Sequence, residues 1–540
     1  MYSTAIRWSA LKRTIALALF CSTALVSVAQ FAYTNNSGVI TITKYTGSDS
    51  VVIIPSTIYG VPVTAIGDYA FDYYSALTSV TIPDTVTNID TAAFMACTGL
   101  SQVTFGTNLI TIGASAFGGC GNLRNITLPN SVISLMFQAF VGCGLTSVLI
   151  PRNVATIGQN AFGCSGLTNI AVDPLNATYS SADGVMCDKS QTRILLCPQG
   201  RGGSYTVPDT VTSIGDTAFS SCFRLENITI GSSVTNIGSG AFDGCSQLGS
   251  IVIPDSVIGL GGGAFRACTG LATAKIGRGI TSLPGGVFSG CLGLTNVTLP
   301  EGLDNIQSVA FAGCASLSNV IIPEGVTYIG QGAFGGCISL TSVIIPNSVT
   351  QVLYYAFEYC ANLASVTIST AITGLMRETF QGCANLKSVT IPGNVQSIWD
   401  TDFGDCTNLL AMYFQGNSPT LHLDPSAANW GVMVLSNNPN LTIYYLPGTS
   451  GWGPTFGGRP TAIWQPRIRA YDTTFGVQTN QFRFNVSWSN GMTVVLEACA
   501  SLAHPAWYPL QTNLLTADSW YFSDPGWTNY PVRYYRVRSP

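Results

Sequence analysis

Charged side chains are scarce in this chain of 540 residues. Lys, Arg, Asp and Glu make up 9% of it, against roughly 25% in an average soluble domain. The 22 basic residues form no cluster, apart from Arg7, Lys12 and Arg13 near the N-terminus. Because binding to phosphates requires concentrated Lys and Arg, we expect no nucleic acid among the partners.

Histidine is rarer still, since the chain has only His422 and His504. No motif places a third group beside either one, as a Ser-His-Asp or Cys-His site would need. The sequence also lacks a phosphate loop with its lysine, and it has no Cys-x-x-Cys pair. Paired carboxylates stay open, but most acids lie in turns such as "IPDTV", where a solvated role is expected. We predict no catalytic residue, no metal site and no cofactor, in a chain that is not an enzyme.

The N-terminus has the pattern of a secretory signal peptide. Basic residues precede an apolar run from Thr14 to Ala29, and small residues at Ser27 and Ala29 fit a cleavage site. About 16 apolar residues are short for a bilayer span, so an anchor is the weaker alternative. Cleavage after Ala29 would change the net charge from −4 to −7. We expect a secreted or cell-surface protein, without a membrane span in the mature chain.

A period of 23 residues dominates the rest of the sequence. Phenylalanine recurs at intervals of 23, 23, 23, 22 and 57 residues, and then eight more times at 23. The 57-residue interval holds an irregular insert. Repeats of this length indicate a solenoid. The fourteen positions are Phe71, Phe94, Phe117, Phe140, Phe162, Phe219, Phe242, Phe265, Phe288, Phe311, Phe334, Phe357, Phe380 and Phe403.

Each repeat reads Leu-x-x-Val-x-Ile-Pro-x-x-Val-x-x-Ile-Gly-x-x-Ala-Phe-x-x-Cys, as in "LTSVIIPNSVTQVLYYAFEYC" from Leu340 to Cys360. The segment Leu-x-x-Val-x-Ile alternates like a strand with one buried face, and the proline that usually follows has no N–H to continue the strand. Ala-Phe-x-x-Cys is too short for more than one helical turn. No repeat can bury its apolar residues alone, so stacked repeats would share a core along a continuous parallel sheet.

The repeat resembles the Treponema-type leucine-rich repeat of the BspA-like bacterial surface proteins, over about Val51 to Leu410. The resemblance implies a leucine-rich-repeat horseshoe, with a parallel β-sheet on the concave face and short 3-10 or helical turns on the convex face. It also implies adhesion or binding to extracellular macromolecules. Within it, "YSSADGVMCDKSQTRILLCPQG" is similar to the hairpin-bearing irregular repeat of such proteins.

We predict five parts for the chain. From Arg467 onward, short alternating stretches such as "QFRFNVSW" indicate a small antiparallel β-sandwich. Its Trp and Tyr residues fit core packing or carbohydrate binding, and packing is favoured. The parts are a signal peptide (1–29), an N-terminal cap (30–58), a solenoid of about 14 repeats (59–414) with its irregular hairpin insert near 173–207, a C-terminal cap (415–466) and the β-sandwich module (467–540).

Thirteen cysteines follow the same period, and three interpretations compete. Metal binding is weak, because each repeat offers one thiol and no histidine. Disulfides between neighbouring repeats are a weaker interpretation, because Cβ atoms in register would lie about 4.8 Å apart, farther than a disulfide prefers, and because thirteen cysteines cannot all pair. Packing is favoured because Tyr74 takes the equivalent place in the first repeat. Cys187 and Cys197 flank a hairpin turn near Ser190, and their pairing stays open.

The outward face of the predicted sheet is the candidate binding surface. The residues two and four places after each Leu point away from the core, and they are mostly short hydroxyls and amides. Such residues could bind an extracellular protein or glycan, or they could only solvate the sheet. Alternatives are a structural envelope component and a polysaccharide-targeting accessory protein, and the oligomeric state stays open. The candidates are Ser79, Thr81, Gln102, Thr104, Asn125, Thr127, Asn227, Thr229, Asn296, Thr298, Ser365, Thr367, Ser388 and Thr390.

Overall fold

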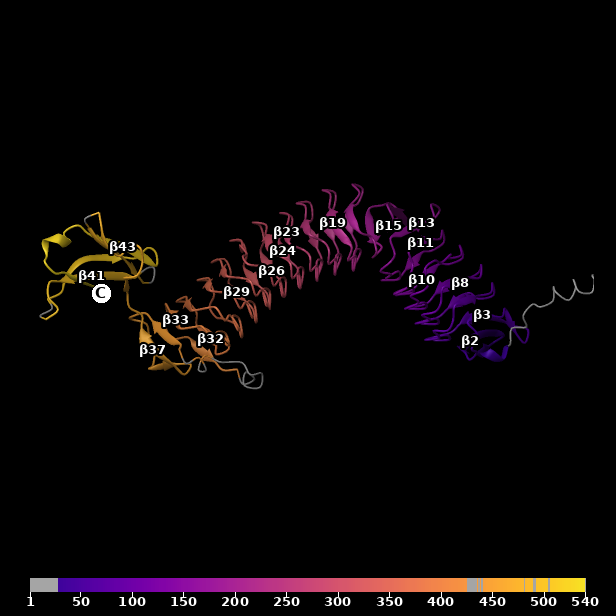
Figure 1. The fold of residues 1–540 in the computed structure, drawn as a ribbon, viewed down its shortest axis with the longest axis horizontal. Helices are drawn as coiled ribbons and strands as arrows, with labels where there is room; N and C mark the ends of the chain where they lie inside the picture. The colour runs from indigo at the N-terminus through magenta and orange to yellow at the C-terminus, as the bar shows by residue number, and fades with distance from the viewer. Residues whose placement is uncertain are drawn as a thin grey trace, which may run out of the picture. The chain divides into compact units, whose positions relative to one another are not determined.

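The computed structural model describes residues 28–424, 435, 438, 440–479, 481–488, 492–503 and 506–539. The predicted signal peptide, up to residue 27, and His504 therefore lie outside the described residues. The chain divides into two compact units, Met1–Gly249 and Ser250–Pro540 (Figure 1). The predicted repeats continue through both units, and the domain boundaries drawn from the sequence remain predictions.

The N-terminal unit begins with an antiparallel pair and continues as two stacks of parallel strands. β1 (Phe31–Asn36) pairs with β2 (Val39–Tyr45), which then pairs in parallel with β5 (Val61–Ile66). Strands of successive repeats pair with an offset of 23 residues, as Ser79 does with Gln102. We call the row of predicted strands the first sheet, although in this unit it consists of three short parallel sheets. These are β3 (Val51–Ile53), β6 (Ser79–Thr81) and β8 (Gln102–Thr104), then β11 (Ser147–Ile150) and β13 (Asn169–Val172), then β17 (Gly203–Thr206) and β19 (Leu225–Thr229).

A second parallel sheet was not expected from the sequence. The Val-x-x-Ile-Gly segments form strands of two residues whose isoleucine or leucine enters the core. Their alternation is too short to register as a strand in one repeat, and only stacking gives it partners. In the N-terminal unit they are β7 (Asn88–Ile89), β9 (Thr111–Ile112), β10 (Ser134–Leu135), β12 (Thr156–Ile157), β18 (Ser213–Ile214) and β20 (Asn236–Ile237).

The insert forms the expected hairpin. β14 (Tyr179–Ala182), β15 (Val185–Asp188) and β16 (Arg193–Leu196) are antiparallel, and β16 then pairs in parallel with β18. Cys187 lies opposite Ile194 in this register. Cys197 instead follows β16, and its carbonyl oxygen accepts a hydrogen bond from the thiol of Cys222 at 3.8 Å. The hairpin therefore does not place the two cysteines opposite each other.

The C-terminal unit repeats the same two-sheet arrangement. Its first sheet contains β21 (Ser250–Val252), β23 (Thr273–Lys275), β25 (Asn296–Thr298), β28 (Ser342–Ile344), β30 (Ser365–Thr367), β31 (Ser388–Ile391), β33 (Ala411–Phe414), β35 (Thr442–Tyr445) and β37 (Arg459–Ile463), with β36 (Thr455–Phe456) antiparallel to β37. Its second sheet contains β24 (Ser282–Leu283), β26 (Asn305–Ile306), β27 (Tyr328–Ile329), β29 (Gln351–Val352), β32 (Ser397–Trp399) and β34 (Thr420–His422).

The last part of the chain folds into the predicted antiparallel sandwich. One sheet holds β38 (Arg467–Arg469), β39 (Gly476–Gln478), β40 (Gln481–Ser487) and β43 (Ser519–Asp524), and the other holds β41 (Thr493–Cys499), β42 (Tyr508–Leu514) and β44 (Tyr534–Arg538). Phe484, Val486, Leu496 and Phe522 pack together in its core. Packing therefore explains part of the aromatic density in the module, whereas other aromatic side chains, such as that of Tyr471, are exposed.

The phenylalanines of the repeats form columns of stacked rings. The rings of Phe94 and Phe117 lie 5.1 Å apart with an interplanar angle of 5°, and those of Phe334 and Phe357 lie 5.3 Å apart at 2°. All four side chains are fully buried. Burial of each such ring contributes about 1.5–3 kcal/mol, so the column adds substantially to the apolar core of the repeats.

The Ala-Phe-x-x-Cys segments make turns rather than a continuous helix. The N–H of Cys97 donates to the carbonyl of Phe94, three residues earlier, at 3.3 Å. However, Ala92 and Ala96 have φ angles of 53° and 55°, which break a helix of L-residues. The N–H groups freed in this way pair with the next repeat, as Phe94 does with Ala116 at 2.7 Å. The turns therefore add a third set of bonds between repeats.

Candidate functional site

The structure places twelve of the fourteen predicted surface residues on strands of the first sheet, whereas Asn125 and Thr127 lie outside any strand. Ser365 and Thr367 of β30 are exposed while Val366 between them is buried. Ser79 and Thr81 of β6 are only half-buried. The residues in the N-terminal unit are Ser79, Thr81, Gln102, Thr104, Asn125, Thr127, Asn227 and Thr229, and those in the C-terminal unit are Asn296, Thr298, Ser365, Thr367, Ser388 and Thr390. Their role in binding remains a prediction.

The outward face is less uniformly polar than the selected repeats suggested. Val252, Ile321 and Ile344 occupy the place of the threonine in their repeats, and they are 57%, 78% and 66% exposed. Valine and isoleucine side chains form no hydrogen bonds, so a face that alternates them with hydroxyls recognises a polar ligand less specifically. The residues that could define a site must therefore lie where further groups join the sheet.

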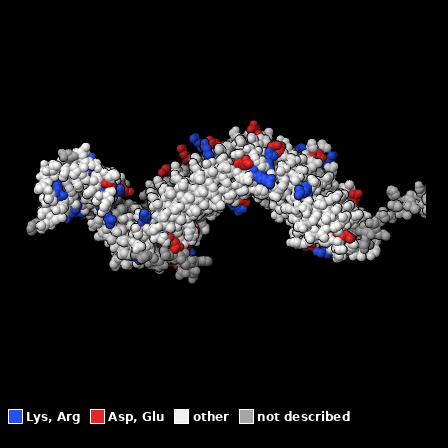
Figure 2. Space-filling model, in the orientation of Figure 1, with Lys and Arg blue, Asp and Glu red and all other residues white. Residues whose placement is uncertain are grey.

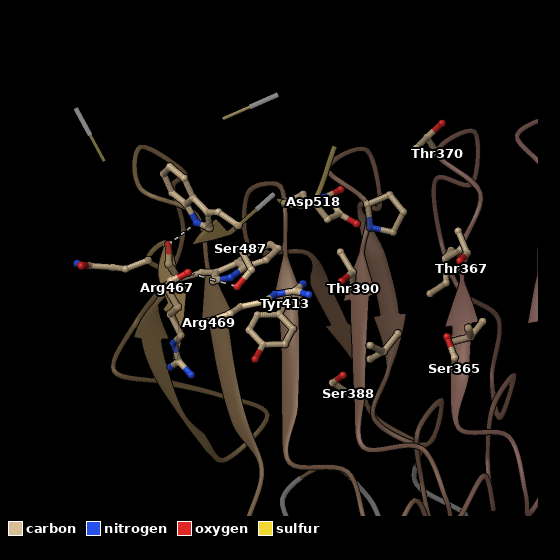
Figure 3. Close-up of a pocket in the computed structure, with 18 residues that line it drawn as sticks. Ser365, Thr367, Thr370, Ser388, Thr390, Tyr413, Arg467, Arg469, Ser487 and Asp518 are labelled. Carbon is tan, nitrogen blue, oxygen red and sulfur yellow. Dashed lines mark hydrogen bonds between the residues drawn. The ribbon is translucent and has the colours of Figure 1, made fainter. Parts of the chain in front are cut away.

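Four of the predicted residues do meet further groups in the C-terminal unit. A groove of about 760 Å³ lies between the first sheet and the sandwich (Figure 3). On the sheet side, Ser365, Thr367, Ser388 and Thr390 line it, together with Val366, Ile368, Thr370, Val389, Pro392, Tyr413 and Gln415. On the other side, Trp464, Gln465, Arg467, Arg469, Ser487, Trp488 and Asp518 line it. We call this site the polar groove.

An aromatic surface continues the hydroxyl column inside the polar groove. Tyr413 is paired with Thr390 in the register of β31 and β33, so it takes the place of the threonine one repeat later. Its ring stacks on Tyr444 at 5.1 Å and touches Trp464 at 4.8 Å. Burial raises the pKa of Tyr413, while Arg467 opposes the shift. The phenol is therefore neutral near pH 7 and can donate a hydrogen bond.

Two arginines enter the polar groove from the sandwich. Arg467 and Arg469 are alternate residues of β38, and Ile468 between them packs against the sandwich core. Because successive side chains of a strand point to opposite faces, both arginines point away from that core. The guanidinium carbon of Arg467 lies 5.8 Å from the centre of the Tyr444 ring. Arg467 thus lies beside the aromatic cluster that Tyr413 forms with Tyr444 and Trp464.

The sandwich is fixed to the last repeats by buried contacts. Leu446, which follows β35, is part of the sandwich core. The backbone N–H of Trp464 donates to the carbonyl of Tyr445 at 2.6 Å. The backbone carbonyl of Trp464 accepts the indole N–H of Trp488 at 3.0 Å. The two walls of the polar groove are therefore joined by packing as well as by the chain.

Sequence reasoning missed the aromatic and charged half of this site. Tyr413 could have been found, because it lies 23 residues after Thr390 on the repeat period. Trp464, Arg467 and Arg469 had no such signal, since the period ends before them and only the fold brings them to the sheet. The packing interpretation of the aromatic residues concerned only the sandwich, and no role was predicted for Trp464 or Tyr413.

The cysteines of the repeats are buried and lie on the core side. All sixteen cysteines of the described residues are free and buried.

Within the part of the chain that the structure describes, no group of three or more His, Cys, Asp or Glu side chains is placed to hold a metal ion. Across the same residues, no helix is both long and apolar enough to cross a membrane.

A group of buried acids near the last repeats differs from the solvated acids that we expected. Asp402 is fully buried, and its carboxylate accepts the N–H of Trp399 at 2.8 Å. Burial holds the pKa of Asp402 well above its usual range. Asp400 accepts the N–H of Asp424 at 3.0 Å, and Asp424 forms an ion pair with Arg377 at 2.6 Å. These acids bond to backbone N–H groups and to a cation of nearby repeats, which indicates a structural role.

Comparisons with known proteins agree with the repeat pattern. The profile described as the BspA type leucine rich repeat region, in 6 copies, matches residues 64–182, 203–318 and 304–423. A leucine-rich repeat protein from Bacteroides ovatus is 27% identical, with 73% of this chain and 98% of that chain covered and a TM-score of 0.51. One from Eubacterium ventriosum is 26% identical, with 64% and 91% covered and a TM-score of 0.50. Among curated proteins, none matches this chain.

Proposed function

Because the chain belongs to the family of BspA-type leucine-rich repeat proteins, we propose that it binds extracellular macromolecules, either protein or glycan, through the first sheet. The proposal includes secretion, on the basis of the predicted signal peptide, and it assigns no catalytic step to the chain. Solenoids present long, regular surfaces for such binding.

The observation that carries this proposal is the composition of the polar groove. It combines short hydroxyls from β30 and β31 with the aromatic surface of Tyr413 and Trp464 and with two arginines. Aromatic and arginine side chains are the groups that contribute most to binding energy, and the rest of the sheet has few of them. The polar groove is therefore the part of the surface best suited to hold a ligand.

The test is a binding screen with the full chain from residue 30 onward, on arrays of glycans and extracellular proteins. Wild type is compared with a variant that carries Ser388→Ala, Thr390→Ala and Tyr413→Ala. Loss of a wild-type signal in this variant, with the fold retained by circular dichroism, supports the proposal. An absence of binding on both arrays would favour a structural envelope component instead.

The matched control variant changes the same sheet far from the polar groove. Asn296→Ala with Thr298→Ala removes two exposed side chains of β25, which lie on the same outward face. Binding through the polar groove leaves this control at wild-type affinity, whereas binding along the whole sheet weakens it as well. The second outcome would keep the binding function and change its location.

A further inference from the structure

The charge of the polar groove differs from that of the rest of the molecule. The chain without its first 29 residues has a net charge of −7, and Lys, Arg, Asp and Glu are sparse and scattered on the face shown in Figure 2. The polar groove has two cations, Arg467 and Arg469, and one acid, Asp518. A local excess of positive charge on an acidic chain favours an anionic ligand.

The backbone of β33, which holds Tyr413, is already paired on both sides. It pairs with β31 on one side and with β35 on the other. An extended peptide therefore cannot add to β33 as a new strand, which is a common way to bind peptides. Recognition must come from side chains alone, and these are hydroxyls, aromatic faces and guanidinium groups.

These side chains fit a sugar chain with acidic groups. Aromatic faces stack on the apolar faces of sugar rings, and the hydroxyls of Ser388 and Thr390 can exchange hydrogen bonds with sugar hydroxyls. The planar guanidinium group binds carboxylate or sulfate through two parallel hydrogen bonds. In Figure 3, Tyr413 lies between the two arginines on one side and Ser388 and Thr390 on the other. A sugar bound at Tyr413 would therefore have guanidinium groups and hydroxyls on either side of it.

We infer that the polar groove binds an anionic glycan, with a sugar ring against Tyr413 and Trp464 and the acidic group at Arg467 and Arg469. This inference rests on the proposed function and names its ligand class. The acidic group can be a carboxylate or a sulfate, because both suit guanidinium.

The test compares anionic oligosaccharides with a neutral control, by calorimetry with the chain from residue 30 onward. Oligogalacturonate is the carboxylate probe, its fully methyl-esterified form is the neutral control, and carrageenan oligosaccharides are the sulfate probe. We expect at least one anionic probe to bind, and added salt to weaken its binding. If the free acid of oligogalacturonate binds, its methyl ester should bind at least about tenfold more weakly.

Three variants test the residues. Arg467→Gln and Arg469→Gln should each weaken binding of the anionic probe about tenfold, as expected for loss of one charge-assisted pair. Asp518→Asn should strengthen it about threefold, because it removes a like charge. Lys275→Gln, an exposed cation elsewhere on the first sheet, is the control and should leave the affinity unchanged.

Each other outcome has a definite meaning. Equal affinity for the free acid and its methyl ester, unchanged affinity in both arginine variants, or weaker binding by Asp518→Asn would overturn the anionic assignment. So would failure of every anionic probe while a protein or a neutral glycan binds, and in that case the proposed function survives. Failure of every ligand on both arrays overturns the proposed function itself.

Discussion

The thiol of Cys120 donates a hydrogen bond to the carbonyl oxygen of Phe94 in the preceding repeat, with 3.2 Å between Sγ and O. The same bond, with the same spacing of 26 residues, recurs in most repeats, as between Cys291 and Phe265 at 3.1 Å. Next to the insert, Cys222 donates to the carbonyls of Cys197 and Pro198 instead. Each such cysteine thus fills the core and ties its repeat to the one before. Packing was the interpretation favoured from the sequence, but the bond to the phenylalanine carbonyl was not foreseen.

Removal of one thiol should destabilise its repeat by a modest amount. Cys314 is fully buried and donates to the carbonyl of Phe288 at 3.2 Å. That carbonyl also accepts the N–H of Cys291 at 3.1 Å, so Cys314→Ala should cost only about 1 kcal/mol in lost burial and bonding. Thermal unfolding followed by circular dichroism measures the loss. An equal effect from Asn319→Ala, an exposed change, would contradict this role.

The thiols should be unreactive until the protein unfolds. Burial raises the pKa of Cys97 to about 12 and that of Cys187 to about 11, and the thiolate is the reactive form. We expect iodoacetamide to modify few cysteines of the native chain at pH 8, and most of the sixteen after denaturation without reductant, as counted by mass spectrometry. A count near zero after denaturation would instead show a disulfide ladder.

Loss of the buried NH₂ group of Asn176 should destabilise the fold. Its Nδ2 donates to the carbonyls of Pro151 at 2.8 Å and Val154 at 3.0 Å, inside the core. In Asn176→Asp, a carboxylate would face two carbonyl oxygens, and we expect a cost of about 3 kcal/mol or more. The matched control is Asn122→Asp, since exposed Asn122 donates to the carbonyl of Thr98 at 2.8 Å. Similar melting temperatures for both variants would contradict the argument.

One acid should make stability depend on pH near neutrality. Burial, followed by the charge of Glu378, raises the pKa of Glu358 from 4.5 to about 7. The folded state therefore binds a proton more tightly than the unfolded state. This contribution to stability is complete below pH 4.5 and is lost as the pH rises through 7.

The variant Glu358→Gln removes this titration. Compared with wild type, it should have a higher melting temperature at pH 8, and the difference should shrink toward zero at pH 4.5. Thermal unfolding of both proteins across this range measures the difference. A constant difference between pH 4.5 and 8 would show that Glu358 does not titrate in the window.

Features that recur with the period could be predicted from the sequence, and those that depend on single contacts could not. The phenylalanine and cysteine positions fixed the solenoid, its register and the outward face of Ser365 and Thr367. The two-residue strands such as Asn88–Ile89 went unnoticed because each becomes a strand only beside its copies. The wall formed by Trp464 and Arg467 depends on how the sandwich packs on Leu446, and no periodic signal reports such a contact.

Hydroxyl-radical footprinting of the full chain, with and without the ligand that the arrays identify, tests the central claim most directly. Tyr413 and Trp464 in the polar groove report on binding there. Trp399 and His422, whose rings lie 5.1 Å apart on β32 and β34 of the second sheet, serve as internal controls. We predict that the ligand protects Tyr413 and Trp464 from oxidation and leaves Trp399 and His422 unchanged. Protection of the second pair alone, or of neither pair, would contradict a binding site in the polar groove.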